Sequence, residues 1–325
     1  MSKCLVRTES LKKYFPVKEE FGKTKYIHAV ENVSLHIDEG ETLGLVGESG
    51  CGKTTLGRTI LRLYGPTGGK IFYRDRDITE IDMLPFRRKM QIIFQDPAGS
   101  LNPRMTVSEI IGEPVDIHGL AKTNAQRKDK IARLLSLVGL NSEHANRYPH
   151  EFSGGQQQRI GIARALAVEP EFIVCDEPVS ALDVSIQSQI VNMLDDMQKE
   201  LKLTYLFISH DISVVRHISN RIGVMYLGHL VELSESFELY NNPFHPYTKS
   251  LLSAVPIPDP KVTRARQRLI LKGESPNPMV LNPGCRFASL CPQAAQRCFK
   301  EVPELKEIKP GHYAACHFTD TNYCS

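Results

Sequence analysis

The pattern of apolar and polar positions changes along the chain, and each change predicts a different kind of element. Residues 1–40 and 70–78 contain short runs with partial alternation, which is typical of an antiparallel β-layer. Three later runs, Glu41–Val46, Phe172–Cys175 and Thr204–Ile208, are almost wholly apolar, as expected of strands buried in a parallel sheet. The pattern therefore predicts an α/β protein with a mostly parallel sheet and an N-terminal antiparallel layer.

Helical periodicity appears between and after these strands. Residues 54–63 follow the first buried strand and its glycine-rich turn as a helix. In a second segment, Ile131, Leu134, Leu135 and Val138 recur at i, i+3, i+4 and i+7, which predicts an amphipathic helix in an α-helical subdomain at about 96–165. A third stripe follows the second buried strand and consists of Ile186, Ile190, Leu194, Met197 and Leu201.

The domain organisation follows from length and from proline content. At 325 residues the chain is long enough for one main domain with an appendage, and we place the main domain at 1–240. Prolines then accumulate in NPFHPY and VPIPDP, so residues 241–270 are predicted to be an extended linker. Residues 271–325 form a small cysteine-rich extension.

Composition restricts the possible partners. The chain is 41% hydrophobic and 24% charged with a net charge of +3, which is too small to indicate nucleic-acid binding. No run approaches the roughly 18 apolar residues of a membrane-spanning helix, and the N-terminus lacks a signal-peptide core. We therefore expect a cytosolic subunit that reaches a membrane only through a partner.

The segment GESGCGKTT at 47–55 has the residue types of a phosphate-binding loop between a strand and a helix. Glycines let successive backbone N–H groups turn inward, where the helix N-terminus adds favourable polarity for an anion. Lys53 is expected to reach the β- and γ-phosphates, and the Thr54 hydroxyl to bind Mg²⁺. The predicted ATP contacts are Gly47, Glu48, Ser49, Gly50, Cys51, Gly52, Lys53, Thr54 and Thr55.

Two adjacent carboxylates end the second buried strand. Asp176 and Glu177 follow FIVC directly, at the carboxyl edge where open α/β sheets bind ligands. We expect Asp176 to hold Mg²⁺ through its water shell and Glu177 to act as the general base that polarises the attacking water.

Four cysteines in the extension, Cys285, Cys291, Cys298 and Cys316, are spaced C-x5-C-x6-C-x17-C. Such a cluster in a small segment suggests a metal centre that compensates for a small core. Zinc and iron–sulfur both accept four thiolates, His312 and His317 are further candidate ligands, and the residues alone leave either metal or none open.

The ordered motifs GESGCGKTT at 47–55, FSGGQQQR at 152–159, FIVCDEP at 172–178 and ISHD at 208–211 together resemble the ATPase subunit of ABC transporters. This resemblance implies a P-loop NTPase core. It also implies that Gln95 belongs to the Q-loop, which senses magnesium and water and couples to the membrane partner. His210 would contact the γ-phosphate, and Phe15 would stack on adenine, with Tyr14 as the alternative.

The same resemblance implies that one chain is not a complete enzyme. In the family, the signature motif faces the nucleotide of an opposite ATPase subunit, and a D-loop aspartate, here Asp183, lies across the same seam. Two subunits then enclose two ATP molecules. The signature residues in this sequence are Ser153, Gly154, Gly155 and Gln156.

A narrower resemblance rests on QDPAGSLNPRMTV at 95–107, RYPHEFSGGQQQR at 147–159, NNPFHPYTKSLLSAVP at 241–256 and the cysteine-rich tail. These segments look like the dipeptide/oligopeptide branch of ABC importers. The branch implies two membrane subunits, an extracellular peptide-binding protein, a position at the cytoplasmic face of the membrane and a [4Fe–4S] cluster on the tail cysteines, with structural zinc as the alternative.

Two other functions compete with peptide import. Relatives with similar ATPase subunits carry nickel or other solutes, and some ABC ATPases act without a membrane partner. The second class usually has two cassettes or a long coiled-coil insertion, and this chain has neither. The sequence leaves open whether the partner ATPase is identical or different.

Overall fold

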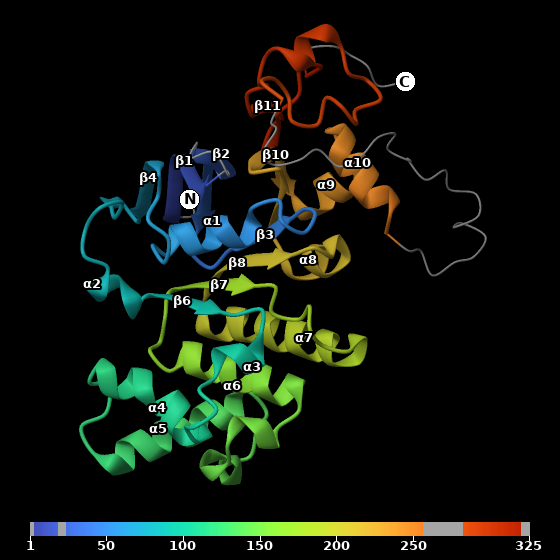
Figure 1. The fold of residues 1–325 in the computed structure, drawn as a ribbon. Helices are drawn as coiled ribbons and strands as arrows, with labels where there is room; N and C mark the ends of the chain where they lie inside the picture. The colour runs from blue at the N-terminus through green and yellow to red at the C-terminus, as the bar shows by residue number, and fades with distance from the viewer. Residues whose placement is uncertain (1–2, 19–23, 256–281, 320–325) are drawn as a thin grey trace, which may run out of the picture. The chain divides into compact units, whose positions relative to one another are not determined.

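The computed structural model describes residues 3–18, 24–255 and 282–319 (Figure 1). These residues form two compact units. Within the described ranges, the first contains residues 3–5, 37–42 and 80–208, and the second contains residues 6–18, 24–36, 43–79, 209–255 and 282–319.

The first unit contains three parallel strands, β6 (Met90–Ile93), β7 (Phe172–Asp176) and β8 (Thr204–Ser209). Strand β7 pairs with β6 on one side and β8 on the other, with Cys175 in register with both Ile93 and Phe207. Every residue of β7 and β8 is buried, which explains their nearly unbroken apolar sequence. The predicted parallel strands are confirmed here.

Helices make up the rest of the first unit. They are α2 (Leu84–Arg87), α3 (Pro97–Ser100), α4 (Val107–Ile117), α5 (Asn124–Leu137), α6 (Gly154–Leu166) and α7 (Val184–Leu201), with short 3₁₀ helices at Ser142–Asn146 and Pro149–Glu151. The predicted stripe on α5 is buried. On α7, Ile190, Leu194 and Met197 are buried, whereas Leu201 is exposed because it ends the helix.

The second unit contains two sheets. An antiparallel sheet has the order β2-β1-β4-β5 and confirms the predicted N-terminal layer. In the other sheet, β3 pairs in parallel with β9, which pairs antiparallel with β10. The strands of the unit are β1 (Cys4–Lys18), β2 (Thr24–Asp38), β3 (Thr42–Val46), β4 (Gly68–Tyr73), β5 (Arg76–Asp77), β9 (Arg221–Tyr226) and β10 (His229–Glu235).

The C-terminal segment 282–319 adds strands to the second of these sheets. Strand β12 (His312–Ala314) pairs with β10, and β11 (Lys306–Lys309) pairs with β12 (Figure 1). The segment thus extends the sheet of its unit, a feature that the sequence pattern did not indicate.

Helices of the second unit correct one expectation. They are α1 (Lys53–Ile60), α8 (Ile212–Ile218), α9 (Ser236–Asn241) and α10 (Pro246–Ser253), with a 3₁₀ helix at Gln296–Phe299. The prediction of an extended linker at 241–270 was wrong over α10. Pro246 occupies the first turn of α10, where a missing N–H costs nothing, so proline starts this helix. Residues 256–270 of the predicted linker lie outside the described residues.

Within the described ranges, no helix has the length and apolar character needed to cross a bilayer.

Candidate functional site

The loop at 47–55 is shaped by close backbone approaches inside the second unit. A Cβ on Gly52 would lie 2.0 Å from the Ala29 carbonyl oxygen, and one on Gly47 would lie 2.2 Å from the Met225 carbonyl oxygen. Gly52 also has φ +106°, which L side chains rarely adopt. Glycine is therefore required at both positions for the loop to pass between β2 and β9.

Gly52 is also the N-cap of α1, and no side chain caps this helix. Because glycine has no side chain, this N-cap residue cannot itself offer the oxygen that serine, threonine or aspartate supplies to the first turn at other helix starts. Glu48, Ser49 and Gly50 form the exposed part of the loop. An uncapped helix start next to exposed loop amides is suited to bind an anion.

Lys53 lies inside the loop, with 3% of its surface exposed. Its Nζ donates hydrogen bonds to the carbonyl oxygens of Gly47 at 2.7 Å and Glu48 at 2.9 Å. The ammonium group is thus held within the turn. Cys51 is also buried, and burial raises the pKa of its thiol, so this cysteine packs as a neutral residue.

In the first unit, β7 delivers Asp176 and Glu177 to its carboxyl end, as predicted. Asp176 is fully buried, and Glu177 Oε2 accepts a hydrogen bond from Gln95 Nε2 at 2.9 Å. The backbone of Glu177 has φ +46° and its N–H donates to Ile208 O at 3.0 Å. A non-glycine residue in this conformation is strained by about 1 to 3 kcal/mol, and such strain is concentrated at functional sites.

The contact between Gln95 and Glu177 joins two residues that are distant in sequence. Gln95 follows β6 and Glu177 follows β7, and these strands are parallel neighbours, so their carboxyl ends meet at one edge. The amide and carboxylate groups brought together there are oxygen donors of the kind that Mg²⁺ binds.

The signature turn Ser153–Gln156 forms the start of α6 in the same unit. Ser153 is the N-cap, its Oγ accepts from the Gln156 N–H at 3.4 Å, and Gln156 Oε1 accepts from the Ser153 N–H at 3.1 Å. A Cβ on Gly155 would lie 2.6 Å from Ile186 Cγ2, so this turn packs against the start of α7, where Asp183 is the N-cap.

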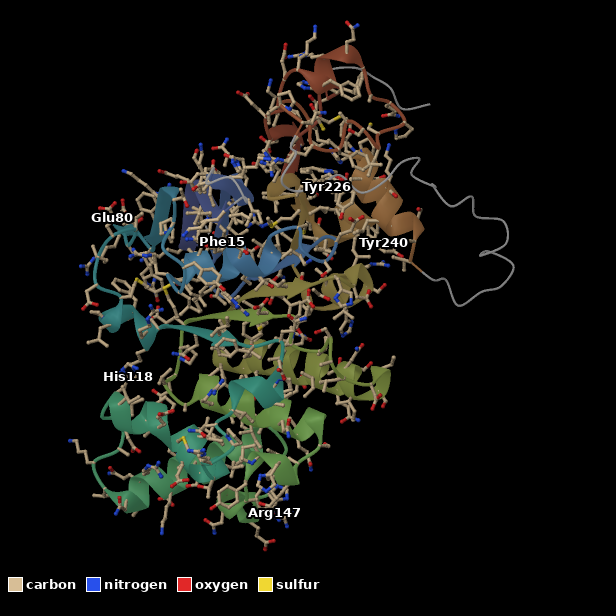
Figure 2. The ribbon with its side chains drawn as sticks, in the orientation of Figure 1. Phe15, Glu80, His118, Arg147, Tyr226 and Tyr240 are labelled. Carbon is tan, nitrogen blue, oxygen red and sulfur yellow. The ribbon has the colours of Figure 1, made fainter. Side chains whose placement is uncertain are left out.

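The second unit holds the other predicted nucleotide contacts. His210 is exposed immediately after β8, next to Asp211, the N-cap of α8. Phe15 lies on β1 (Figure 2). Tyr64 lies edge-on to the Phe15 ring at a centroid distance of 5.5 Å. Tyr14 is stacked on His28 at 4.0 Å and hydrogen bonds to Glu31. Each candidate therefore has a ring face covered, Tyr14 by His28 and Phe15 by the Lys13 ammonium group at 4.9 Å from the ring centroid, so both stay candidates for the adenine platform.

The four tail cysteines gather in the C-terminal segment as free thiols. The Cys285 N–H donates to Cys298 O at 2.7 Å. Burial, and then the neighbouring Cys298, Cys291 and Cys316, raise the pKa of Cys285 to about 11.

No metal centre is confirmed at these cysteines. Within residues 3–18, 24–255 and 282–319, no three or more His, Cys, Asp or Glu side chains are placed to hold an ion. The histidines have other partners, since His312 Nε2 lies 2.7 Å from the buried Glu232 carboxylate and His317 Nε2 lies 2.9 Å from Glu301 O.

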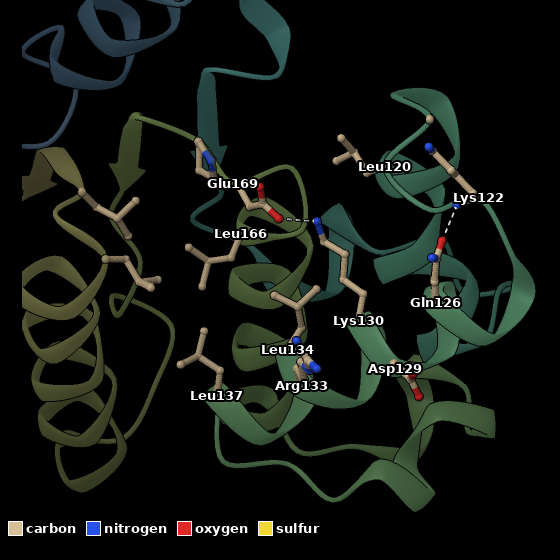
Figure 3. Close-up of a pocket in the computed structure, with 14 residues that line it drawn as sticks. Leu120, Lys122, Gln126, Asp129, Lys130, Arg133, Leu134, Leu137, Leu166 and Glu169 are labelled. Carbon is tan, nitrogen blue, oxygen red and sulfur yellow. Dashed lines mark hydrogen bonds and ion pairs between the residues drawn. The ribbon is translucent and has the colours of Figure 1, made fainter.

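A cavity of about 890 Å³ in the first unit does not coincide with any predicted site residue (Figure 3). It is lined by the α4–α5 connection, α5, the α6–β7 connection and the end of α7. Lys130 Nζ and Glu169 Oε1, which both line the cavity, form an ion pair at 2.6 Å. Its mixed lining carries none of the predicted chemistry.

Comparison with known families is consistent with these motifs. Residues 30–180 match the family described as ABC transporter, and residues 231–298 match the C-terminal region of oligopeptide/dipeptide transporters. The second match includes three of the four clustered cysteines, Cys285, Cys291 and Cys298.

Curated relatives match over nearly the full chain. The putative oligopeptide transport ATP-binding protein YkfD of Bacillus subtilis is 55% identical over 96% of this chain and 95% of its own length. Oligopeptide transport ATP-binding protein OppF of the same organism is 54% identical, with 97% of each chain covered. Among solved structures, the dimeric ATP-binding cassette MJ0796 bound to ADP and Pi has a TM-score of 0.65 and 31% identity, covering 71% of this chain and 99% of that one.

Proposed function

The chain belongs to the ABC transporter family, and from this premise we propose that it is the ATPase subunit that powers uptake of dipeptides and oligopeptides through partner membrane subunits. The observation that carries the catalytic part is the strained Glu177 at the end of β7, hydrogen bonded to Gln95 at 2.9 Å. The proposal that peptides are the cargo is based on the near full-length similarity to oligopeptide transport ATP-binding proteins.

In this proposal, ATP binds with its phosphates on the loop at 47–55. The backbone amides and the uncapped start of α1 receive the phosphates, and Lys53 exchanges its hydrogen bonds to Gly47 O and Glu48 O for the β- and γ-phosphates. Phe15 stacks on the adenine. Thr54, Gln95 and, through water, Asp176 would hold the Mg²⁺ that neutralises phosphate charge.

Hydrolysis proceeds by in-line attack of water on the γ-phosphate. Glu177 accepts a proton from that water, and Gln95 fixes the carboxylate orientation through its amide N–H. The buried strand β7 and the positive φ of Glu177 define where the carboxylate can lie. His210 contacts the γ-phosphate, as the family resemblance implies.

A second ATPase subunit, identical or different, completes each site. Ser153, Gly154, Gly155 and Gln156 contact the nucleotide of that partner, and Asp183 lies at the shared seam. The dimeric state of cassette MJ0796 supports this arrangement. The partners that cross the membrane are two permease subunits, with an extracellular peptide-binding protein delivering cargo, so this subunit lies at the cytoplasmic face of the membrane.

The proposal is tested with the transporter assembled from this chain and its partner subunits. Glu177→Gln keeps ATP binding but lowers ATP turnover and uptake of a labelled oligopeptide by about 1,000-fold, since the general base is lost. Lys53→Ala weakens ATP binding itself. Glu171→Gln is the matched control, because Glu171 precedes the opposite end of β7 and pairs with Lys89 on the surface.

Wild-type turnover in Glu177→Gln would show that Glu177 is not the general base. If the transporter takes up nickel and not the oligopeptide, the ATPase function stands and the cargo is nickel.

For the tail, we propose that Cys285, Cys291, Cys298 and Cys316 hold a [4Fe–4S] cluster, with structural zinc as the alternative. The support is the chemistry of the set, because four cysteine thiolates can hold such a cluster, and the position of three of the four cysteines in the segment similar to the C-terminal region of oligopeptide/dipeptide transporters. Iron and acid-labile sulfide in near-equal amounts in anaerobically purified protein are the expected result. Zinc without sulfide would indicate a structural zinc site. The absence of both iron and zinc would reject both proposals.

A further inference from the structure

Tyr247 contacts the phosphate loop although it lies nearly 200 residues after it in the sequence. The Glu48 backbone N–H donates a hydrogen bond of 3.0 Å to the Tyr247 hydroxyl oxygen. Tyr247 is the second residue of α10 and is 1% exposed. Burial raises its pKa far above the ordinary value, so the hydroxyl is neutral at physiological pH and accepts this bond.

We propose that Tyr247, braced by residues of the C-terminal segment, is a positioning residue that holds the phosphate loop in its nucleotide-binding conformation. The inference rests on the proposed ATP binding at this loop and adds a component to that site from outside the motifs. It makes the segment around Cys285 a structural part of nucleotide binding.

Two aromatic rings hold the Tyr247 side chain in place. The Tyr247 ring packs against Tyr226 at a centroid distance of 4.6 Å and against Phe287 at 5.6 Å, and Phe287 is 1% exposed. His245 Nδ1 accepts from the Tyr247 N–H at 3.1 Å and fixes the start of α10. The hydroxyl therefore has little freedom to leave Glu48, and Phe287 of the C-terminal segment supplies one wall.

Arg286, adjacent to Phe287 in the C-terminal segment, provides a second set of contacts. Its guanidinium donates to Leu227 O and lies 3.6 Å from Glu31, with 8% of the side chain exposed. Leu227 belongs to the β9–β10 turn, and the next residue, Gly228, donates its N–H to Cys51 O in the phosphate loop at 2.8 Å. Arg286 thus secures the turn that holds the other side of the loop.

The bond to Tyr247 matters because the hydrogen bonds to the Glu48 carbonyl come from within the loop and from Lys53. The Glu48 carbonyl accepts from Lys53 Nζ and from the Cys51 N–H at 3.2 Å, and the bond from Lys53 is lost when Lys53 turns to a phosphate. The bond to Tyr247 uses the Glu48 N–H and can persist through that change. It leaves the later amides of the loop directed at the anion.

The test measures binding of a non-hydrolysable ATP analogue, with Mg²⁺, to the full chain. Tyr247→Phe keeps the ring and its packing but removes the hydroxyl, and we expect the dissociation constant to rise about fivefold with an unchanged melting temperature. In the turnover assay, KM for ATP rises and kcat stays near the wild-type value. The control is Tyr226→Phe, which removes a hydroxyl from the same cluster that makes no hydrogen bond to the loop among the described residues.

Wild-type affinity in Tyr247→Phe would overturn the proposal. An equal loss in Tyr226→Phe would also overturn it, because the effect would then come from general packing. Lys53→Ala separates this inference from the function on which it rests, because unchanged affinity in that variant would reject ATP binding at the loop itself.

Discussion

Two helix starts with glycines, at α1 and at α6, differ in how their N-cap residues meet the helix. At α1 the N-cap is Gly52, which offers no side-chain oxygen to the helix. At α6 the N-cap is Ser153, which exchanges hydrogen bonds with Gln156 in a capping box. The N-cap of the first helix start therefore offers no side-chain oxygen to its helix, whereas the second start satisfies two of its own N–H groups.

This difference separates a site formed by tertiary contacts from one formed locally. The loop before α1 depends on Ala29 O, Met225 O and the Tyr247 hydroxyl, which come from three other elements. The turn before α6 is stabilised by residues only three positions apart. We infer that the phosphate loop is pre-organised for tight binding, while the signature turn is a stable surface that contributes when a partner subunit is present.

Among substitutions at these two helix starts, Gly52→Ala has the largest expected effect. The new methyl group would overlap the Ala29 carbonyl oxygen at 2.0 Å and would require φ +106°, so the loop must move. We expect kcat/KM for ATP to fall about 100-fold, since displacement of a binding element by about 1 Å has effects of this size. Steady-state turnover measures it. Wild-type kinetics would show that the loop does not need its contact with β2.

A smaller effect is expected for Ser153→Ala. Loss of the cap lowers the free energy of unfolding by about 1 kcal/mol. The variant also lowers turnover of the assembled transporter by about tenfold or more, because one hydrogen bond to a charged group of the nucleotide is lost. Binding of ATP to the isolated chain stays unchanged.

The matched control for Ser153→Ala is Thr106→Ala. Thr106 and Glu109 form a capping box of the same design at α4, with bonds of 3.3 Å and 2.7 Å. We expect the same loss of stability in chemical denaturation and wild-type turnover. Equal turnover in the two variants would show that Ser153 acts only as a helix cap.

The smallest effect is expected for Gly50→Ala. Gly50 has φ +78°, but a Cβ there meets nothing within 4 Å. The substitution adds only backbone strain of about 1 kcal/mol, so kcat/KM should change less than about fivefold. Comparison with Gly52→Ala by the same assay separates strain from collision. A loss as large as that of Gly52→Ala would indicate that conformational freedom alone controls the loop.

Local pattern was sufficient for the buried strands and for much of the helix content. The run Phe172–Cys175 is apolar because both faces of β7 are covered, and the α5 stripe is buried as its periodicity predicted. Proline misled the prediction at α10, since Pro246 occupies the one part of a helix that tolerates it. The NNPFHPYTKS segment contains the residue that contacts Glu48, but nothing in its pattern indicates that contact.

The sequence by itself determined the order of the motifs, the family and the chemistry available at each motif, because these depend on residue type and on short spacing. Only the tertiary structure decided which distant groups meet. Parallel pairing of β6 and β7 brings Gln95 to Glu177, and packing of α10 and the C-terminal segment brings Tyr247 to Glu48. Such contacts depend on burial and strand pairing across many residues, which no local pattern encodes.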